Sequence, residues 1–480
     1  MLSLVRLAAE INIKSPRVKA AFLRRLRANL KAALTDGGHR FTVEGDWARI
    51  FIKSDDPTVT DTAARVFGLS SVSPVDFTTN PTIAAMCEAA QNHYAEILKG
   101  KTFCVRAKRH SRVGGFTSVE AERLIGAALF PLARGVVMKR PDVLVEVEIR
   151  PEAAYFFTRR IPAPGGLPLG VEGRVLVLLS GGFDSAVAAW LMQKRGCAVD
   201  YLFLNLAGAA YERSVLTVAK ALETVWSNGA HSHFHILDFA PIAAAIKASV
   251  KPAYNQVVLK RMMYKAAEAL ALALPDRGYA AIITGEAIGQ VSSQTLHNLA
   301  AIDSATTMAV FRPLITYDKE EIITLARKIG TYALCEHVQE YCALTPKHPV
   351  THASPSRAAT ATDALDPSLI SNAVTSRRSI RLREFEMTEV LSDYLFANEI
   401  PEGARIIDLR EPHQYQAWHH SDAENLAIED VLRLPKVGKY LLYCPFGLQS
   451  AVAAEKLQKA GYEAYSFRGG SQRLRQLEDA

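Results

Sequence analysis

The 480-residue sequence has no uncharged apolar run of about 18 residues, and its start, MLSLVRLAAEINIKSPR, has no apolar signal-peptide core before a small-residue cleavage site. These absences argue against a membrane protein and favour the cytoplasm as its location. Six cysteines are scattered without a CxxC pair or a regular spacing. That pattern argues against a zinc site and against a secreted disulfide framework.

The sequence also lacks an excess of acidic residues. It contains 56 Lys and Arg and 49 Asp and Glu, which gives a net charge of +7. The basic excess is N-terminal: residues 1–165 hold 25 Lys and Arg against 16 Asp and Glu, and the rest holds 31 against 33. A basic module suits a polyanionic partner, since phosphate contacts by Lys and Arg release counterions. A solvated basic surface is the alternative, and charge alone does not exclude it.

An apolar fraction of 49% with 22% charged residues is typical of a globular protein, and 480 residues are too many for one core. We therefore expect several domains of α/β and α+β type. Their predicted limits are residues 1–60, 61–165, 166–345, a linker at 346–385, and 386–480.

The N-terminal part shows two α+β patterns. Residues 15–34 have apolar residues at helical spacing after Ser15 and Pro16, which predicts a helix with one packed face and one cationic face. Strands are predicted over 40–43 and 48–52. Residues 102–109, TFCVRAKR, alternate apolar and basic side chains, which predicts a strand with a basic face. The candidate RNA-binding residues on this strand are Arg106, Lys108 and Arg109.

From residue 174 the pattern changes to alternating strands and helices. The continuous apolar run 175–179 is typical of a parallel strand buried on both faces, and later strands over 201–205, 234–239 and 280–284 predict a doubly wound α/β domain. Residues 346–378 are rich in Ala, Ser, Thr and Pro, which predicts an exposed linker. A second, small α/β unit follows.

The segment Ser180–Ser185, SGGFDS, stands between the buried strand and a helix. Its glycines allow the backbone to approach a ligand, and its N–H groups and the helix N-terminus suit an anion. It lacks the lysine and the spacing of GxxxxGK[ST], and instead resembles the PP-loop of N-type ATP pyrophosphatases. Ser180 and Ser185 would donate to phosphate, and Asp184 would hold Mg²⁺ or orient the nucleotide. A ligand-free tight turn is the alternative.

Further polar groups stand near predicted strand ends of the same domain, where open α/β sheets bind ligands. Gly285 permits a close approach to a nucleotide, and Gln294 can contact a base edge or a phosphate. Lys260 and Lys319 can stabilise the charge on a leaving pyrophosphate. For either lysine alone, a surface role is the competing interpretation.

Cys444 follows the apolar strand 440–443 and opens CPFGLQS before a helix. Loop N–H groups and the helix dipole favour a thiolate there. The spacing resembles the rhodanese loop that carries a persulfide, with Asp408–Glu411 upstream and Arg468–Gly470 downstream in rhodanese order. A buried structural cysteine is the alternative. Nothing in the surroundings of Cys342 marks it as activated.

The HSHFH segment carries three alternating histidines that suit metal ligands, namely His231, His233 and His235. No nearby cysteine or carboxylate completes a ligand set before Asp238. We therefore favour a structural role and predict no metal site built from protein ligands.

The motifs together resemble the tRNA 4-thiouridine synthetase family (ThiI; tRNA uracil 4-sulfurtransferase) along nearly the whole chain. EINIKSPRVKAAFLRRLRANL resembles its ferredoxin-like region, and FCVRAKRHSRVGGFTSVEAERLIGAAL with PDVLVEVEI resembles its THUMP RNA-binding domain. VLVLLSGGFDS, LKRMM, TGEAIGQVSSQTL, RPLITYDKEEI and EYC resemble its ATP domain. YCPFGLQSA resembles its rhodanese extension.

This resemblance implies that ATP adenylates O4 of uridine 8 in tRNA and that a cysteine desulfurase of the IscS type loads Cys444 as a persulfide. The family's second cysteine falls on Cys342, which would resolve the persulfide and form a redox disulfide with Cys444. Nucleotide contacts carry over to a set that includes main-chain groups: Leu178, Leu179, Ser180, Gly181, Gly182, Ser185, Lys260, Gly285 and Gln294. Asp184 and Lys319 match catalytically important positions.

The family also supplies sulfur to a ThiS-like thiocarboxylate carrier for thiamine thiazole synthesis, which would rest on Cys444. Two other functions compete with the tRNA reaction. An amide-forming ligase would use the same phosphate loop, but it leaves the basic module and the cysteine loop unexplained. A non-catalytic RNA-binding or chaperone protein would not need Asp184 or Cys444.

Overall fold

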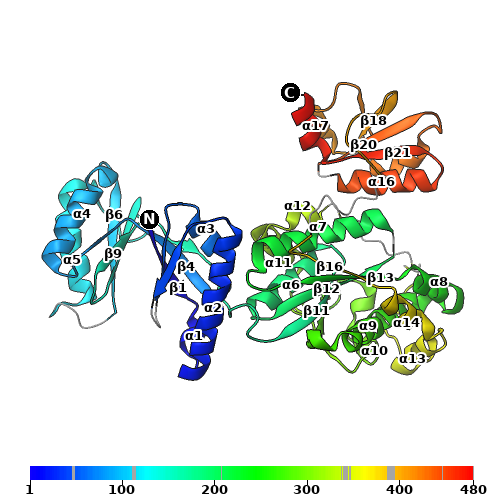
Figure 1. Cartoon of the computed structure of the whole chain (residues 1–480), viewed down its shortest axis with the longest axis horizontal. Helices are drawn as coiled ribbons and strands as arrows, with labels where there is room; N and C mark the ends of the chain where they lie inside the picture. The colour runs from blue at the N-terminus through cyan, green and yellow to red at the C-terminus, as the bar shows by residue number, and fades with distance from the viewer. Residues whose placement is uncertain are drawn as a thin grey trace. The chain divides into compact units, whose positions relative to one another are not determined.

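The structure is a computed structural model that describes all residues except 46–48, 111–114, 207, 337, 339–343, 345–347, 386–394, 446 and 479–480. It contains two compact units, one of residues 1–171 with 194–196 and one of residues 172–193 with 197–480. Figure 1 gives the element labels for both units. None of the helices in the described part of the chain has the length and apolar character needed to cross a membrane.

The first unit begins with an antiparallel sheet in the order β10-β4-β1-β3-β2. Its strands are β1 Leu2–Leu7, β2 Thr42–Gly45, β3 Arg49–Lys53, β4 Leu69–Val75 and β10 Ile161–Pro162, and its helices are α1 Ala9–Asn12, α2 Pro16–Asp36 and α3 Val59–Ala63. Leu26, Leu30 and Leu34 of α2 are fully buried, as the helical spacing of the sequence predicts. The sheet extends beyond the predicted domain boundary at residue 60, because it also includes β4 and β10 from later in the chain.

A second five-stranded sheet in the same unit has the order β5-β9-β8-β6-β7. Its elements are β5 Phe77–Thr79, α4 Ile83–Leu98, β6 Thr102–Arg109, α5 Ser118–Leu129, β7 Gly135–Val136, β8 Val143–Ile149 and β9 Ala154–Phe157. The helices α4 and α5 lie together on one face of the sheet (Figure 1). Buried Tyr94, Phe103 and Phe156 fill the space between these layers.

The second unit contains a six-stranded sheet in the order β15-β14-β11-β12-β13-β16. Its strands are β11 Arg174–Leu178, β12 Ala198–Asn205, β13 His233–Asp238, β14 Tyr279–Ile283, β15 Ala309–Phe311 and the antiparallel edge strand β16 Arg378–Arg381. Its helices are α6 Phe183–Lys194, α7 Ala209–Trp226, α8 Ala240–Ser249, α9 Asn255–Ala273, α10 Leu296–Asp303, α11 Lys319–Ile329 and α12 Tyr332–Cys335.

The order of this sheet reverses at β11, since β12 and β13 extend to one side and β14 and β15 to the other. Such a switch point opens a crevice at the carboxyl ends of the two strands that meet there. These strands are β11 and β14, which run in parallel, so the residues that follow them lie at the same edge. The predicted doubly wound domain is present.

Residues 348–385, the described part of the predicted linker 346–385, are not an exposed linker. They form α13 Pro355–Asp363 and α14 Ser368–Thr375, both of which pack on α9, and then β16, which pairs with β13. The two helices bury mainly small side chains, namely Ala358, Thr362, Ala373 and Val374, and Ala353, Leu365, Leu382 and Phe385 are buried outside them. Alanine-rich faces allow helices to pack closely with little apolar bulk, so composition alone did not reveal the packing.

The last sheet is parallel, with the order β17-β21-β20-β18-β19. Its elements are β17 Phe396–Ala397, β18 Ala404–Asp408, α15 Pro412–Ala417, β19 Ala423–Asn425, β20 Lys439–Tyr443, α16 Leu448–Lys459, β21 Glu463–Phe467 and α17 Gly470–Glu478. This is the small α/β unit that the sequence predicts after residue 386.

Candidate functional site

The loop after β11 has the geometry of an anion cradle. Leu178 ends the strand, α6 begins at Phe183, and Gly181 between them has a φ of +83°. A Cβ atom at Gly181 would lie 3.0 Å from side-chain carbons of Val215 and Val338, so a larger residue would be both strained and crowded. The backbone N–H groups of the loop and of the first turn of α6 are thus available at a helix N-terminus.

The two loop serines have different positions. Ser185 is buried, accepts a hydrogen bond from the Ser180 backbone N–H at 3.2 Å, and donates its hydroxyl to the Gly182 carbonyl at 3.1 Å. Its hydroxyl therefore braces the loop from within. Ser180 is exposed, and it is the serine whose hydroxyl is open to a phosphate.

Asp184 joins three segments that are distant in sequence. Lys319 Nζ lies 2.9 Å from Oδ1, and Gln290 Nε2 donates to Oδ2 at 2.8 Å. Lys319 is the first residue of α11, held there by the capping box of Asp318 and Glu321. The structure therefore brings predicted Asp184 and Lys319 together. Gln290 was missed, although it lies in the same GEAIGQ segment as predicted Gly285.

Gly285 follows β14 and contacts the phosphate loop directly. A Cβ atom on Gly285 would lie 2.5 Å from the Asp184 carbonyl carbon and 2.6 Å from the Ser185 nitrogen. Only glycine allows this close approach of two backbones. The contact fixes the 284–294 segment beside the start of α6.

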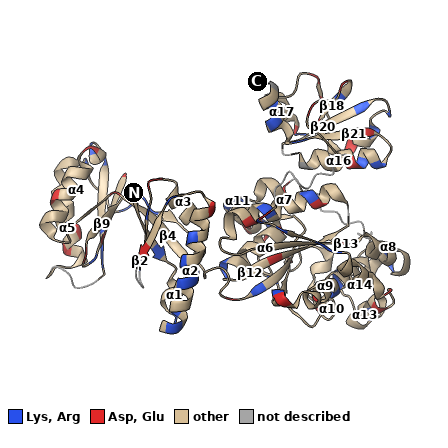
Figure 2. Cartoon of the chain, viewed as in Figure 1, with Lys and Arg blue, Asp and Glu red and all other residues tan. Residues whose placement is uncertain are grey.

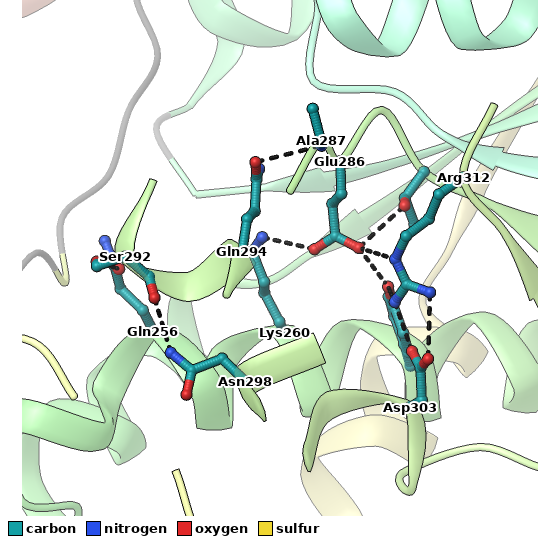
Figure 3. A network of polar contacts seen from close by, with 11 residues as sticks. Gln256, Lys260, Glu286, Ala287, Ser292, Gln294, Asn298, Asp303 and Arg312 are labelled. Atoms are coloured by element: carbon teal, nitrogen blue, oxygen red, sulfur yellow. Dashed lines mark hydrogen bonds and ion pairs between the residues drawn. The ribbon is translucent and has the colours of Figure 1, made fainter. Parts of the chain in front are cut away.

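A buried polar network continues from this contact (Figure 3). Lys260 Nζ lies 2.6 Å from Oε1 of Glu286, and Arg312 Nε donates to Oε2 at 2.9 Å. Burial opposes ionisation of Glu286, but the charges of Lys260 and Arg312 outweigh it and lower its pKa to about 2. Predicted Gln294 lies beside the network and accepts a hydrogen bond from the Ala287 N–H at 3.3 Å.

Cys444 lies directly after β20 and is 1% exposed. Its Sγ accepts hydrogen bonds from the backbone N–H and the hydroxyl of Ser450, each at 3.4 Å. Both donors favour negative charge on sulfur, and they come from the first turn of α16, where the helix dipole acts in the same sense.

The backbone around this cysteine depends on a glycine pair. The Ser471 N–H donates to the Cys444 carbonyl at 2.9 Å, and a Cβ atom on Gly470 would lie 2.4 Å from that oxygen. Gly447 is the N-cap of α16 and has a φ of +79°. The predicted Arg468–Gly470 segment therefore closes over the base of the cysteine loop.

The predicted Asp408–Glu411 segment braces the other side of this loop. Asp408 is fully buried and pairs with Arg410 at 2.5 Å. The Arg410 guanidinium also lies 5.3 Å from the ring centroid of Trp418 and 5.4 Å from that of Tyr443, the residue before Cys444. These contacts order the strand end that presents the thiol.

Cys342 lies outside the described residues. The neighbouring Cys335 ends α12 and is buried, and burial raises the pKa of its thiol to about 12. Cys335 is therefore protonated near neutral pH and is a poor nucleophile.

The predicted RNA-binding residues lie on β6, where acidic side chains stand among the basic ones. Arg106 lies 3.9 Å from Glu122, and the register places Arg106 and Lys108 beside Glu146 and Glu148 of β8. Lys108 is exposed, and the Arg109 guanidinium lies 5.7 Å from the Phe116 ring.

A more continuous basic face lies on α2, the helix whose outer face the sequence predicts to be cationic. Arg24, Arg27 and Lys31 line a surface hollow beside Gly45. Figure 2 shows the basic residues along α2. Their spacing of three and four residues is the signal that places them on one side of the helix.

Two of the alternating histidines, His233 and His235, lie on β13. The His233 and His235 rings lie 5.9 Å apart, and His235 hydrogen bonds to Ser379 and to Tyr279. Burial lowers the pKa of His235 to about 4, so it is neutral near pH 7. These contacts support a structural role.

Four family models match successive stretches of the chain. They are the ThiI ferredoxin-like domain at residues 2–73, the THUMP domain at 80–159, the Thiamine biosynthesis protein (ThiI) at 170–366 and the rhodanese-like domain at 392–476.

Whole-chain relatives agree with these matches. The chain is 36% identical to a tRNA sulfurtransferase of Desulfurococcus amylolyticus over 98% of both chains, and 38% identical to that of Pyrobaculum aerophilum over 96% of this chain and 95% of the relative. It is also similar to a crystal structure of a 4-thiouridine synthetase–RNA complex with bound ATP, at 31% identity and a TM-score of 0.67. That match covers 79% of this chain and 98% of the other.

Proposed function

Because this chain belongs to the ThiI family of tRNA sulfurtransferases, we propose that it uses ATP to transfer persulfide sulfur to uridine 8 of tRNA, giving 4-thiouridine. The observation that carries this proposal is the presence, in one chain, of an anion-binding loop at Ser180–Ser185 and a thiol loop at Cys444. The first suits activation of an oxygen by adenylation, and the second suits carriage of sulfur. A related structure with RNA and ATP supports both substrates.

ATP fits the crevice between β11 and β14. Gly181 and Gly182 give its phosphates access to backbone N–H groups, together with the Ser180 hydroxyl and the main chain of Leu178 and Leu179. Gly285, Lys260 and Gln294 would complete this nucleotide site from the neighbouring segment.

Magnesium fits the same site through Asp184, because Mg²⁺ commonly binds one or two carboxylates together with substrate phosphates. Lys319 and Gln290 each donate a hydrogen bond to one of the two carboxylate oxygens of Asp184 and so fix its orientation. A bound Mg²⁺ would supply charge neutralisation on the phosphates, and Lys319 would supply further positive charge.

The first chemical step activates the base. Uracil O4, with loss of the N3 proton, bonds to the α-phosphorus while the bond from that phosphorus to the bridging oxygen breaks and pyrophosphate leaves. Lys260 and Lys319 stabilise the negative charge that develops on the leaving group.

The second step moves sulfur. The terminal sulfur of a Cys444 persulfide bonds to C4 of the base, and AMP leaves with the former O4. The Cys342 thiolate then attacks Sγ of Cys444, which breaks the persulfide bond, leaves sulfur on the base and forms the Cys342–Cys444 disulfide.

The cycle needs two outside partners. A dithiol reductant supplies two electrons to reopen the disulfide, and a cysteine desulfurase of the IscS type transfers sulfur to the Cys444 thiolate. Both tRNA modification and these partners agree with a cytoplasmic location.

Binding of tRNA is assigned to the basic N-terminal unit, with Arg106, Lys108 and Arg109 of β6 among its phosphate contacts. A second use of Cys444, sulfur supply to a ThiS-like carrier for thiamine thiazole synthesis, is favoured by the description of the matching family model.

Complementation of a deletion strain tests the main proposal. Nucleoside mass spectrometry of tRNA should detect 4-thiouridine with the wild-type protein and none with Asp184→Ala or Cys444→Ala. Unchanged 4-thiouridine in Cys444→Ala would refute the mechanism and favour a non-catalytic role. Transfer of sulfur-35 from cysteine to tRNA should require ATP, whereas an amide-forming ligase would use ATP without labelling tRNA.

A further inference from the structure

Glu286 is a buried acid that the sequence analysis did not single out. It is 6% exposed and follows Gly285, the residue that touches the phosphate loop. An ionised carboxylate is costly to bury unless it is paired and hydrogen-bonded. Its surroundings therefore need an account beyond packing.

The two oxygens of Glu286 have different partners. Oε2 accepts hydrogen bonds from the Tyr264 hydroxyl at 2.8 Å, the Thr284 hydroxyl at 3.0 Å and Arg312 Nε at 2.9 Å. Arg312 is itself held by Asp303 at 2.5 Å. These bonds fix the carboxylate in place and balance the charge of Arg312 with that of Asp303.

Oε1 pairs with Lys260 at 2.6 Å, and in the described part of the chain Lys260 has no other hydrogen-bond or ion-pair partner. An ammonium group has three donors, so one is used by Glu286 and two remain for a ligand. The Lys260 side chain is 22% exposed, so it is not sealed from solvent. Figure 3 shows it extending from α9 to Glu286 beside Gln294.

We propose that Glu286 is a positioning residue that holds the Lys260 ammonium beside the phosphate loop, so that ATP affinity depends on a carboxylate that does not touch ATP. This inference rests on the proposed use of ATP at Ser180–Ser185. A lysine side chain is long and flexible, and ordering it before the nucleotide arrives removes that entropic cost from binding. Gly285 fixes the distance, since it links Glu286 directly to the backbone that packs on Asp184.

Equilibrium binding of ATP to the full-length protein without tRNA tests the inference. Glu286→Gln keeps the shape and the Oε2 bonds but loses the charge that holds Lys260, and it should weaken ATP binding about tenfold, the effect of one charged hydrogen bond. Lys260→Met should weaken binding at least as much. In the double variant, Glu286→Gln should add nothing to the loss caused by Lys260→Met, because the two act through one contact.

A merely structural role predicts a different result. In that case the effect of Glu286→Gln on ATP binding would persist in the Lys260→Met background. The matched control is Arg277→Gln, which removes an equally short buried ion pair with Asp200, 2.6 Å long, at the amino end of β14. It should lower the melting temperature and leave ATP affinity unchanged.

If Glu286→Gln does not fold, Glu286→Asp replaces it in the binding experiment. This variant keeps the negative charge beside Arg312 but has a side chain too short to reach Lys260 in the same way. It should weaken ATP binding, again without effect in the Lys260→Met background. The inference is overturned, without consequence for the proposed function, if the folded Glu286 variant binds ATP with unchanged affinity. It is also overturned if the losses of ATP affinity are additive in the double variant. A wild-type protein that binds no ATP overturns both the inference and the proposed function.

Discussion

Lys319 Nζ lies 2.9 Å from Oδ1 of Asp184, although the two residues are 135 positions apart. The pair places a positive charge at the first turn of α6, beside the loop proposed to hold the phosphates of ATP. It also balances the negative charge of Asp184. Both residues are therefore expected to act before any sulfur chemistry.

Lys319→Met should slow adenylation on the order of 100-fold, because it removes a charge that stabilises the leaving pyrophosphate. Pyrophosphate release in the presence of ATP and tRNA measures this step without need for a persulfide. Lys328→Met, near the other end of α11, is the control and should retain the wild-type rate. Equal rates for Lys319→Met and wild type would contradict the role.

Gly285→Ala should abolish ATP binding, because the added Cβ would lie 2.5 Å from the Asp184 carbonyl carbon. The segment must then move away from the phosphate loop. Titration calorimetry with ATP checks the loss. Gly126→Ala inside α5 is the control: its Cβ meets only Val105 at 4.0 Å, and we expect it to bind ATP normally and to be slightly more stable.

Ser450→Ala should make Cys444 a weaker nucleophile, because it removes the hydroxyl donor to Sγ but keeps the backbone N–H donor. We expect persulfide loading by a cysteine desulfurase to slow about tenfold. Intact-protein mass spectrometry follows the added sulfur. Loading at the wild-type rate would show that the hydroxyl does not assist the thiolate.

Cys342→Ala should block multiple turnovers, since the proposed disulfide with Cys444, whose formation releases the thiolated base, can no longer form. Single-turnover and multiple-turnover assays of 4-thiouridine formation check this result. Cys335→Ala is the comparison, because the pKa of the buried Cys335 thiol is raised to about 12 and the thiol stays protonated at pH 8. Normal turnover by Cys342→Ala would remove its resolving role.

Glu286 should also make the protein sensitive to acid. Its folded pKa of about 2 is below the ordinary value of 4.5, so its contribution to stability is fully present above pH 4.5 and is lost as the pH falls toward 2. The difference in melting temperature between wild type and Glu286→Gln should therefore narrow as the pH falls from 7 to 3. A constant difference over that range would contradict the ion pairing.

Several parts of the protein could be predicted because their chemistry is local. The Ser180–Ser185 loop needs only a buried strand, two glycines and a helix start, all within one stretch of chain. The Cys444 loop is equally compact, and the helix over 15–34 follows from apolar spacing alone. The family resemblance rests on such stretches, and the family matches agree with it.

Other features depend on contacts between distant segments, which no local pattern contains. The packing of residues 348–385 arises because β16 pairs with the edge of β13 and because two helices, α13 and α14, pack on α9. The membership of β4 and β10 in the first sheet has the same origin, since pairing partners far along the chain complete it.

Short sequence motifs thus identify the chemical groups of the site, whereas the tertiary fold determines how these groups are arranged. Asp184 and Cys444 can be recognised in the sequence because each belongs to a loop at a helix N-terminus. Such a loop is formed by residues that are adjacent in the chain. The partners Lys319, Gln290 and Glu286 come together only where β11 and β14 meet at the switch point of the sheet. That meeting is decided by strand order, which depends on the packing of the whole domain.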